Sequence, residues 1–216
     1  MKLNDFVSHM ISLEQRWAGF FANPNYIRSD NTITWPNRIR FDVDTTAELL
    51  VTLVEQRQYS LQVLEDGSVL QIYYGFDHNG SRLQEASLGF FHAGHAIDSE
   101  ADPLTEGVLP ISADENPGGW IRLDYDPTAA RDCLHYHSHL HTSLSGDIRI
   151  PVKRVPTPKQ FVELIIAWFY PETYRARRLT NGAFQLSNDD AQNLFNDLLS
   201  VGDGIPSLNG IHVYVP

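Results

Sequence analysis

The order of hydrophobic patterns along the chain limits its fold more than any other feature. The middle of the chain, roughly residues 59–152, carries several segments with strand-like alternation and no helical pattern between them. Apolar residues at the three- and four-residue spacing of helices lie before and after this region. A doubly wound fold requires repeated strand–helix alternation. We therefore expect one α+β domain spanning residues 1–216, with a mostly antiparallel sheet covered on one face by helices from the N- and C-terminal parts.

The helical segments have recognisable starts. Thr45 and Glu48 have the spacing of a capping box, in which two side chains satisfy backbone N–H groups of the first turn. Thr157 and Gln160 repeat this spacing, and Pro158 occupies the first helical position. The segment after Thr157 is apolar nearly all round, so we expect it to be buried. The predicted helices cover residues 3–21, 45–57 and 158–170, with a last one around 191–199.

The strand segments are separated by turn and loop signals. Asp66-Gly67 suits a two-residue type I′ turn and should join strands over residues 59–65 and 68–76. The loop over residues 94–119 is rich in Gly, Pro and acidic residues, and its length is consistent with a lid, a partner-binding loop or a segment that is simply mobile. The other predicted strands cover residues 32–42 (interrupted at Pro36), 82–92, 120–126, 135–143, 148–152 and 211–215.

Composition and charge exclude several classes of function. The chain has 216 residues, 42% of them hydrophobic, and a formal net charge of -11. Such a charge repels polyanions, so nucleic acid is expected to bind only through a local basic patch. A single cysteine, Cys133, permits no intramolecular disulfide and favours a reducing compartment. The N-terminus lacks an apolar signal core, and no stretch reaches the roughly 20 apolar residues of a membrane span. We therefore expect a cytoplasmic protein without membrane insertion.

One segment, from Arg122 to Arg149, concentrates the residues that can carry chemistry. Side chains alternate between the two faces of a strand, so residues two apart share a face. Four histidines occupy alternate positions of one predicted strand, and an arginine and two carboxylates do the same on the strand before it. If the two strands pair with these faces aligned, the two sets converge. They are His135, His137, His139 and His141, and Arg122, Asp124 and Asp126.

Such a cluster has three chemical uses and one structural alternative. Imidazoles and carboxylates are common ligands of zinc and iron. A His–Asp pair can transfer protons near neutral pH. Arg122 or Arg149 could hold a phosphate or carboxylate with its planar guanidinium. Alternatively, the histidines line a solvated sheet face, Asp124 and Asp126 initiate a turn before Pro127, and Arg122 forms a structural ion pair.

Three other features are weaker candidates. Cys133 lies two residues before His135, but lone cysteines are usually buried and inert. His92 and His95 flank the start of the long loop and could join the same site. A basic run follows the buried helix and could contact a nucleotide phosphate, although cations at a helix end are expected as a solvated face. This run comprises Tyr174, Arg175, Arg177 and Arg178.

Several short motifs follow one another along this part of the chain: Leu123-Asp124-Tyr125-Asp126-Pro127, His135-x-x-Ser138-His139-Leu140, Arg149-Ile150-Pro151-Val152, Thr157-Pro158-x-x-Phe161 and Trp168-Phe169-Tyr170. In this order and spacing they resemble a bacterial family of domains of unknown function, family twenty-two ninety. The resemblance covers roughly residues 120–175. It implies a bacterial or mobile-element protein of uncharacterised activity. It also implies the site positions Arg122, Asp124, Asp126, His135, His139 and Arg149. His137 and His141 are not among them, so a metal site formed by all four histidines is less favoured.

Three functions are consistent with these residues. In the first, the protein is an enzyme that cleaves phosphodiester bonds of RNA or a nucleotide, in a toxin or phage-defence context. His139 would then transfer the proton, Asp124 would orient it, and Arg122 or Arg149 would stabilise the phosphate charge. In the second, it is a non-enzymatic accessory subunit that binds a protein partner. In the third, it is a sensor of a small anionic ligand. The sequence does not identify a cofactor; a metal is possible but not favoured.

Overall fold

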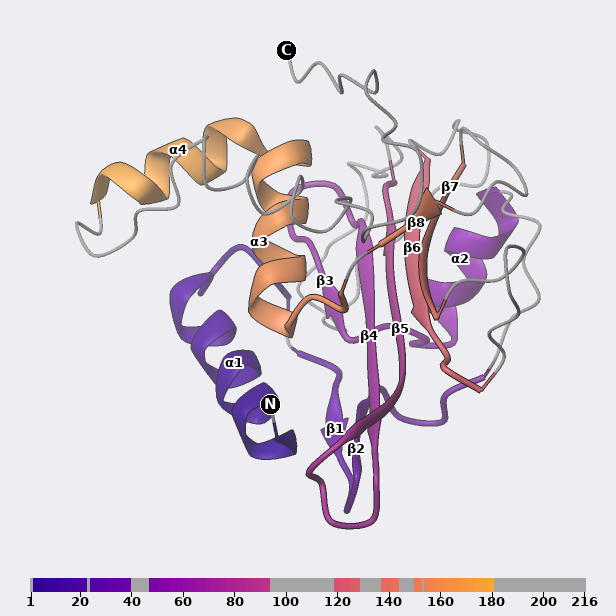
Figure 1. Cartoon of the computed structure of the whole chain (residues 1–216). Coiled ribbons are helices and arrows are strands. Elements are labelled where there is room, and N and C mark those ends of the chain that lie inside the picture. Colours follow the sequence, from indigo (N-terminus) through magenta and orange to yellow (C-terminus); the bar gives the residue numbers. More distant parts are fainter. Residues whose placement is uncertain are drawn as a thin grey trace.

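The computed structural model describes residues 2–22, 24–39, 47–93, 119–128, 137–143, 150–152 and 154–180. Eight strands in these residues form one sheet, with the order β1-β2-β4-β5-β6-β7-β8 and with β3 paired to β4 (Figure 1). All seven strand pairs are antiparallel. The strands are β1 (Ile27–Arg28), β2 (Thr32–Thr34), β3 (Leu61–Gln62), β4 (Val69–Phe76), β5 (Leu83–Phe91), β6 (Trp120–Tyr125), β7 (Ser138–Thr142) and β8 (Ile150–Pro151). The expected α+β fold with an antiparallel sheet is confirmed.

Two helices, α1 (Leu3–Arg16) and α3 (Pro158–Phe169), form a layer on one face of the sheet (Figure 1). Helix α3 begins at the predicted capping box, where the Thr157 side chain accepts from the backbone N–H of Gln160. It ends before Pro171, which starts a further helix, α4 (Pro171–Thr180). Both layer helices bury apolar faces: Leu3, Phe6, Met10 and Leu13 in α1, and Phe161, Val162, Leu164, Ile165 and Ile166 in α3.

The basic run after α3 has a structural use. Arg177, on α4, donates hydrogen bonds of 2.8 and 2.6 Å to the carbonyl oxygens of Arg16 and Ala18. These carbonyls lie at the end of α1, where the last turn leaves acceptors without helical donors. The guanidinium also lies 5.5 Å from the ring centroid of Trp17. Arg177 therefore fastens α4 to the end of α1, which differs from the solvated face that was expected for the basic run.

Alternation along the strands distributes residues between two apolar clusters. Leu70 and Leu88 belong to the main core with α1 and α3, whereas their neighbours on the opposite face, including Val69 and Phe91, pack with Leu53 of helix α2 (Ala47–Glu55). Figure 1 shows α2 on the far side of the sheet from α1 and α3. The expectation that helices cover one face is therefore wrong, because the short α2 covers part of the other.

Other local predictions differ from the structure at element ends. The first helix stops at Arg16 rather than at residue 21, because Trp17 to Phe21 turn to meet Val63. Between β3 and β4, Val63 donates its N–H to the carbonyl of Ser68, which leaves a four-residue turn rather than a two-residue one. Gly67 in this turn has a φ of +76°, a conformation that favours glycine. The predicted helix around 191–199 and strand 211–215 lie outside the described residues, as does the loop except Gly119.

No helix among the described residues is long and apolar enough to cross a lipid bilayer.

Candidate functional site

Strand pairing brings the two predicted sets of side chains together. Asp124 on β6 pairs with His139 on β7, and Arg122 pairs with His141. Because paired residues in an antiparallel sheet project to the same side, all four side chains share one face. Leu123, between the two β6 residues, faces the opposite way into the main core. The predicted alignment of these strand faces is confirmed for these four residues, which we call the sheet-face cluster.

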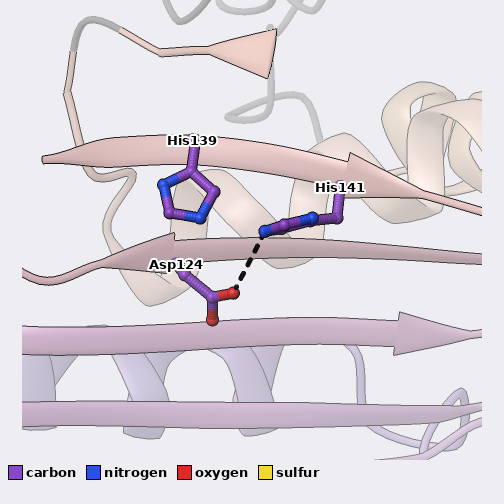
Figure 2. A group of neighbouring side chains, drawn as sticks. All are labelled: Asp124, His139 and His141. Atoms are coloured by element: carbon purple, nitrogen blue, oxygen red, sulfur yellow. Dashed lines mark ion pairs between the residues drawn. The ribbon is translucent and has the colours of Figure 1, made fainter. Parts of the chain in front are cut away.

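Asp124 is the centre of the sheet-face cluster. Its Oδ1 accepts a hydrogen bond of 2.9 Å from the hydroxyl of Ser87 on β5. Its Oδ2 accepts one of 2.8 Å from Nε of Arg122 and lies 3.6 Å from Nε2 of His141 (Figure 2). One carboxylate thus links three adjacent strands, and both of its oxygens have fixed directions.

The two histidines are packed against each other. The ring centroids of His139 and His141 are 4.6 Å apart, and the rings meet edge to face at 72°. His139 is 3% exposed and His141 8%, whereas the side chains of Arg122 and Asp124 are 30% and 23% exposed. The imidazoles are therefore largely shielded from water, and solvent reaches the cluster from the side of the arginine and the carboxylate.

Among the other predicted site residues, the structure describes Asp126 and His137. Asp126 accepts hydrogen bonds from the backbone N–H and the hydroxyl of Thr128, at 2.9 and 2.6 Å, so it stabilises the turn after β6. That is the turn role considered as the alternative for this residue. His137 precedes β7 and is exposed. His135 and Arg149 lie outside the described residues, and so do Cys133 and His95.

Two residues of the observed site, His141 and Ser87, are not among the positions that the family resemblance implied. His141 belongs to the alternating histidine run, and this alternation is the signal in the sequence that identifies it. Ser87 comes from a strand that is distant in sequence, and it reaches Asp124 because these two residues are paired in the register of β5 and β6. A strand register of this kind has no signal in the sequence.

A second group of polar side chains, the turn cluster, consists of Asp66, His92 and Tyr170. The hydroxyl of Tyr170 donates a hydrogen bond of 2.8 Å to Oδ2 of Asp66, and Nε2 of His92 lies 3.3 Å from the same atom. The backbone N–H of Ser68 donates to Oδ1 at 2.9 Å. Burial alone would raise the pKa of Asp66, but the hydrogen bonds from His92, Ser68 and Tyr170 lower it below its usual value. His92 therefore does not belong to the sheet-face cluster.

The sheet-face cluster offers atoms for three kinds of chemistry. One nitrogen from each imidazole and one carboxylate oxygen of Asp124 lie within 4.8 Å of one another, so these residues could hold a metal ion. The imidazoles can also exchange protons with a substrate. Arg122, half-buried beside them, provides a positive charge and the planar donor geometry that suits phosphate or carboxylate. The charged and polar side chains suit the binding of an anionic group better than that of an apolar one.

Comparison with known proteins gives a family but no activity. The sequence matches the family described as "Uncharacterized conserved protein (DUF2290)" over residues 21–200. No curated protein and no solved structure matches the chain. The family match extends well beyond the motifs over residues 120–175 and includes every residue of the sheet-face cluster. The chain therefore belongs to the uncharacterised conserved family DUF2290.

Proposed function

We propose that this protein is a hydrolase that cleaves phosphodiester bonds of RNA or of a nucleotide, and that the sheet-face cluster is its active site. The observation that carries this proposal is the juxtaposition of the Arg122 guanidinium, the Asp124 carboxylate and the two imidazoles on one face of the sheet. Phosphodiester hydrolysis requires an activated oxygen nucleophile and stabilisation of negative charge on the phosphate. The cluster contains residue types suited to both tasks.

The roles follow from the geometry. Arg122 is the most exposed of the four side chains, so its guanidinium would contact the phosphate. His139 and His141 would act on the attacking oxygen. Asp124, fixed by Ser87 and Arg122, would set the orientation of these groups. A site of this size is compatible with the negative net charge of the protein, because it requires positive charge only where one phosphate binds.

One observation favours a second candidate, a non-enzymatic accessory subunit. The hydrogen bonds of Asp124 connect β5 and β6, and its contact with His141 extends the network to β7. A polar network of this kind can fix the register of a sheet without any chemistry. In that case removal of one member would lower the stability of the fold, because its buried partners would lose hydrogen bonds.

A His139→Gln variant distinguishes the two candidates. Glutamine retains polar atoms and leaves less empty volume than alanine at a position that is 3% exposed. If the protein is a hydrolase, cleavage of single-stranded RNA or of cyclic and linear dinucleotides should fall by at least about 100-fold. The melting temperature should stay close to that of the wild type. Cleavage products are measured by chromatography and unfolding by calorimetry.

The matched control is His137→Gln, the same substitution at the exposed histidine two residues away. It should cleave at the wild-type rate. Equal rates for His139→Gln and the wild type, or wild-type activity no higher than a buffer blank on every substrate, would contradict the hydrolase proposal. A large drop in melting temperature of His139→Gln alone would instead support the accessory-subunit function.

The toxin or phage-defence setting is a separate part of the proposal, and it comes from the resemblance to a bacterial family. Induced expression in bacteria should slow growth, or reduce phage yield, for the wild type but not for His139→Gln. Identical growth and phage yield for the wild type and His139→Gln would contradict the toxin or phage-defence setting. The cleavage assay alone would then test the hydrolase proposal.

A further inference from the structure

We infer that the sheet-face cluster binds one divalent transition-metal ion, with Asp124, His139 and His141 as its protein ligands. The inference deepens the proposed function by naming the group that activates the attacking oxygen, and the binding itself does not depend on that function. The first support is convergence: three ligand atoms of the preferred types lie within 4.8 Å of one another. Figure 2 shows the two imidazoles and the carboxylate directed toward a common region.

The spacing of these atoms is close to that of an occupied site. In a tetrahedral zinc site with bonds of about 2.1 Å, ligand atoms are about 3.4 Å apart. Atoms separated by at most 4.8 Å therefore need to move by on the order of 1 Å each to reach a common ion. Rotation of the imidazole and carboxylate groups about their side-chain bonds supplies movements of this size without a change in the backbone.

The strands hold the ligands in a rigid frame. Asp124 and His139 are directly paired, and His141 is two residues along β7 on the same face. The Ser87 hydroxyl and the Arg122 Nε hold the two oxygens of Asp124 from outside the ligand set. Hydrogen bonds of this kind orient the ligands of many metal sites. Each carboxylate oxygen has two lone pairs, so an oxygen that accepts such a bond can still ligate an ion.

The ligand types select the class of ion. Two imidazole nitrogens and one carboxylate oxygen suit zinc, iron and similar ions, whereas magnesium and calcium prefer all-oxygen sites. Three protein ligands leave at least one coordination position for water or substrate, as in catalytic rather than structural sites. An ion there would lower the pKa of a bound water and produce a nucleophile near neutral pH. The imidazoles would then act on the attacking oxygen through the ion.

Metal binding can be measured on the untagged full-length protein after chelator treatment and removal of the chelator. Titration calorimetry with Zn²⁺ should show one equivalent bound, and Mg²⁺ should show none. His139→Gln and His141→Gln should each weaken Zn²⁺ binding by at least about 100-fold, whereas His137→Gln should bind as the wild type does. Less than a tenth of an equivalent on the wild type, or an equal loss in His137→Gln, would overturn the inference.

A second measurement needs no variant and so does not depend on variants that fold. Co²⁺ added to the metal-free wild type should give the visible absorption bands of an ion bound by nitrogen and oxygen ligands in a site with few waters. The spectrum of fully hydrated Co²⁺ would overturn the inference.

Cleavage assays with and without chelator separate this inference from the proposed function. If one equivalent of metal binds but no substrate is cleaved, the hydrolase proposal is refuted and the metal-site inference is retained. If metal-free protein cleaves at an unchanged rate and binds neither Zn²⁺ nor Co²⁺, the metal-site inference is refuted and the hydrolase proposal is retained.

Discussion

Two clusters in this protein contain the same chemical groups but use them differently. Both have a carboxylate that contacts an imidazole: Asp66 with His92 in the turn cluster, and Asp124 with His141 in the sheet-face cluster. In the turn cluster, the carboxylate also accepts from Tyr170 and from the backbone of Ser68. The Tyr170 bond joins the turn before β4 to the junction of α3 and α4, 104 residues along the chain, whereas the Ser68 bond lies within the turn itself.

The difference lies in what each cluster connects. The contacts of Asp66 close the turn before β4 and tie this turn to Tyr170, which lies between two helices, so the turn cluster has a clear structural purpose. The strands under the sheet-face cluster are already paired by backbone hydrogen bonds and packed on the main core. The contact between His141 and Asp124 joins two strands that are already paired. An Asp–His contact is therefore weak evidence of a site unless its other contacts are considered.

The hydrolase proposal predicts that substitutions in the two clusters differ most in their effect on the cleavage rate. Asp124→Asn keeps the shape of the side chain but removes its charge, so we expect the cleavage rate to fall by at least about 100-fold. Asp66→Asn should leave the rate of each folded molecule unchanged. Single-turnover cleavage assays at equal concentrations of folded protein make this comparison. Similar losses in both variants would mean that the clusters do not differ in role.

Stability should respond in the opposite way. Asp66→Asn replaces a largely buried acceptor of three contacts by an amide, and it leaves Tyr170 and His92 with weaker partners. We expect the free energy of unfolding to fall by about 2 kcal/mol. Asp124→Asn, at a side chain that is 23% exposed, should lower it by about 1 kcal/mol or less. Urea unfolding followed by circular dichroism gives both values, and a larger loss for Asp124→Asn would reverse the assignment of roles.

A smaller effect is expected on the pH dependence of stability. The pKa of Asp66 is lowered in the folded protein, so its charged form contributes stability that is present above its usual value of 3.8. This contribution should be lost as the pH falls below 3.8 and through the lower folded value. The stability difference between the wild type and Asp66→Asn should therefore be constant above about pH 5 and shrink toward pH 3. A difference that grows on acidification would contradict the lowered pKa.

The sequence was informative where a local pattern decides the structure. Alternation predicted which faces of β6 and β7 carry Asp124 and His139, because side-chain direction on a strand follows directly from residue parity. The capping box at Thr157 predicted the start of α3 because its hydrogen bonds lie within four residues. The sequence motifs also indicated the family that the match over residues 21–200 confirms.

The sequence was uninformative where distant segments decide the structure. The Ser87 contact depends on strand register, and the turn cluster joins Asp66 to Tyr170 across 104 residues. Helix α2 was predicted near its observed bounds, but its position on the opposite face depends on which apolar residues of the sheet it covers. The two-residue turn at Asp66-Gly67 was wrong because Asp66 serves the turn cluster and β3 ends earlier.

We propose that the two imidazoles of the sheet-face cluster are present for chemistry rather than for the fold. The most direct test is the free energy of unfolding of the metal-free double variant His139→Gln/His141→Gln, compared with that of the metal-free wild type. We expect a loss of about 1 kcal/mol or less, because the strands and the core hold this part of the sheet without the histidines. A loss of about 3 kcal/mol or more would show that the histidines belong to a structural network and would refute the proposal.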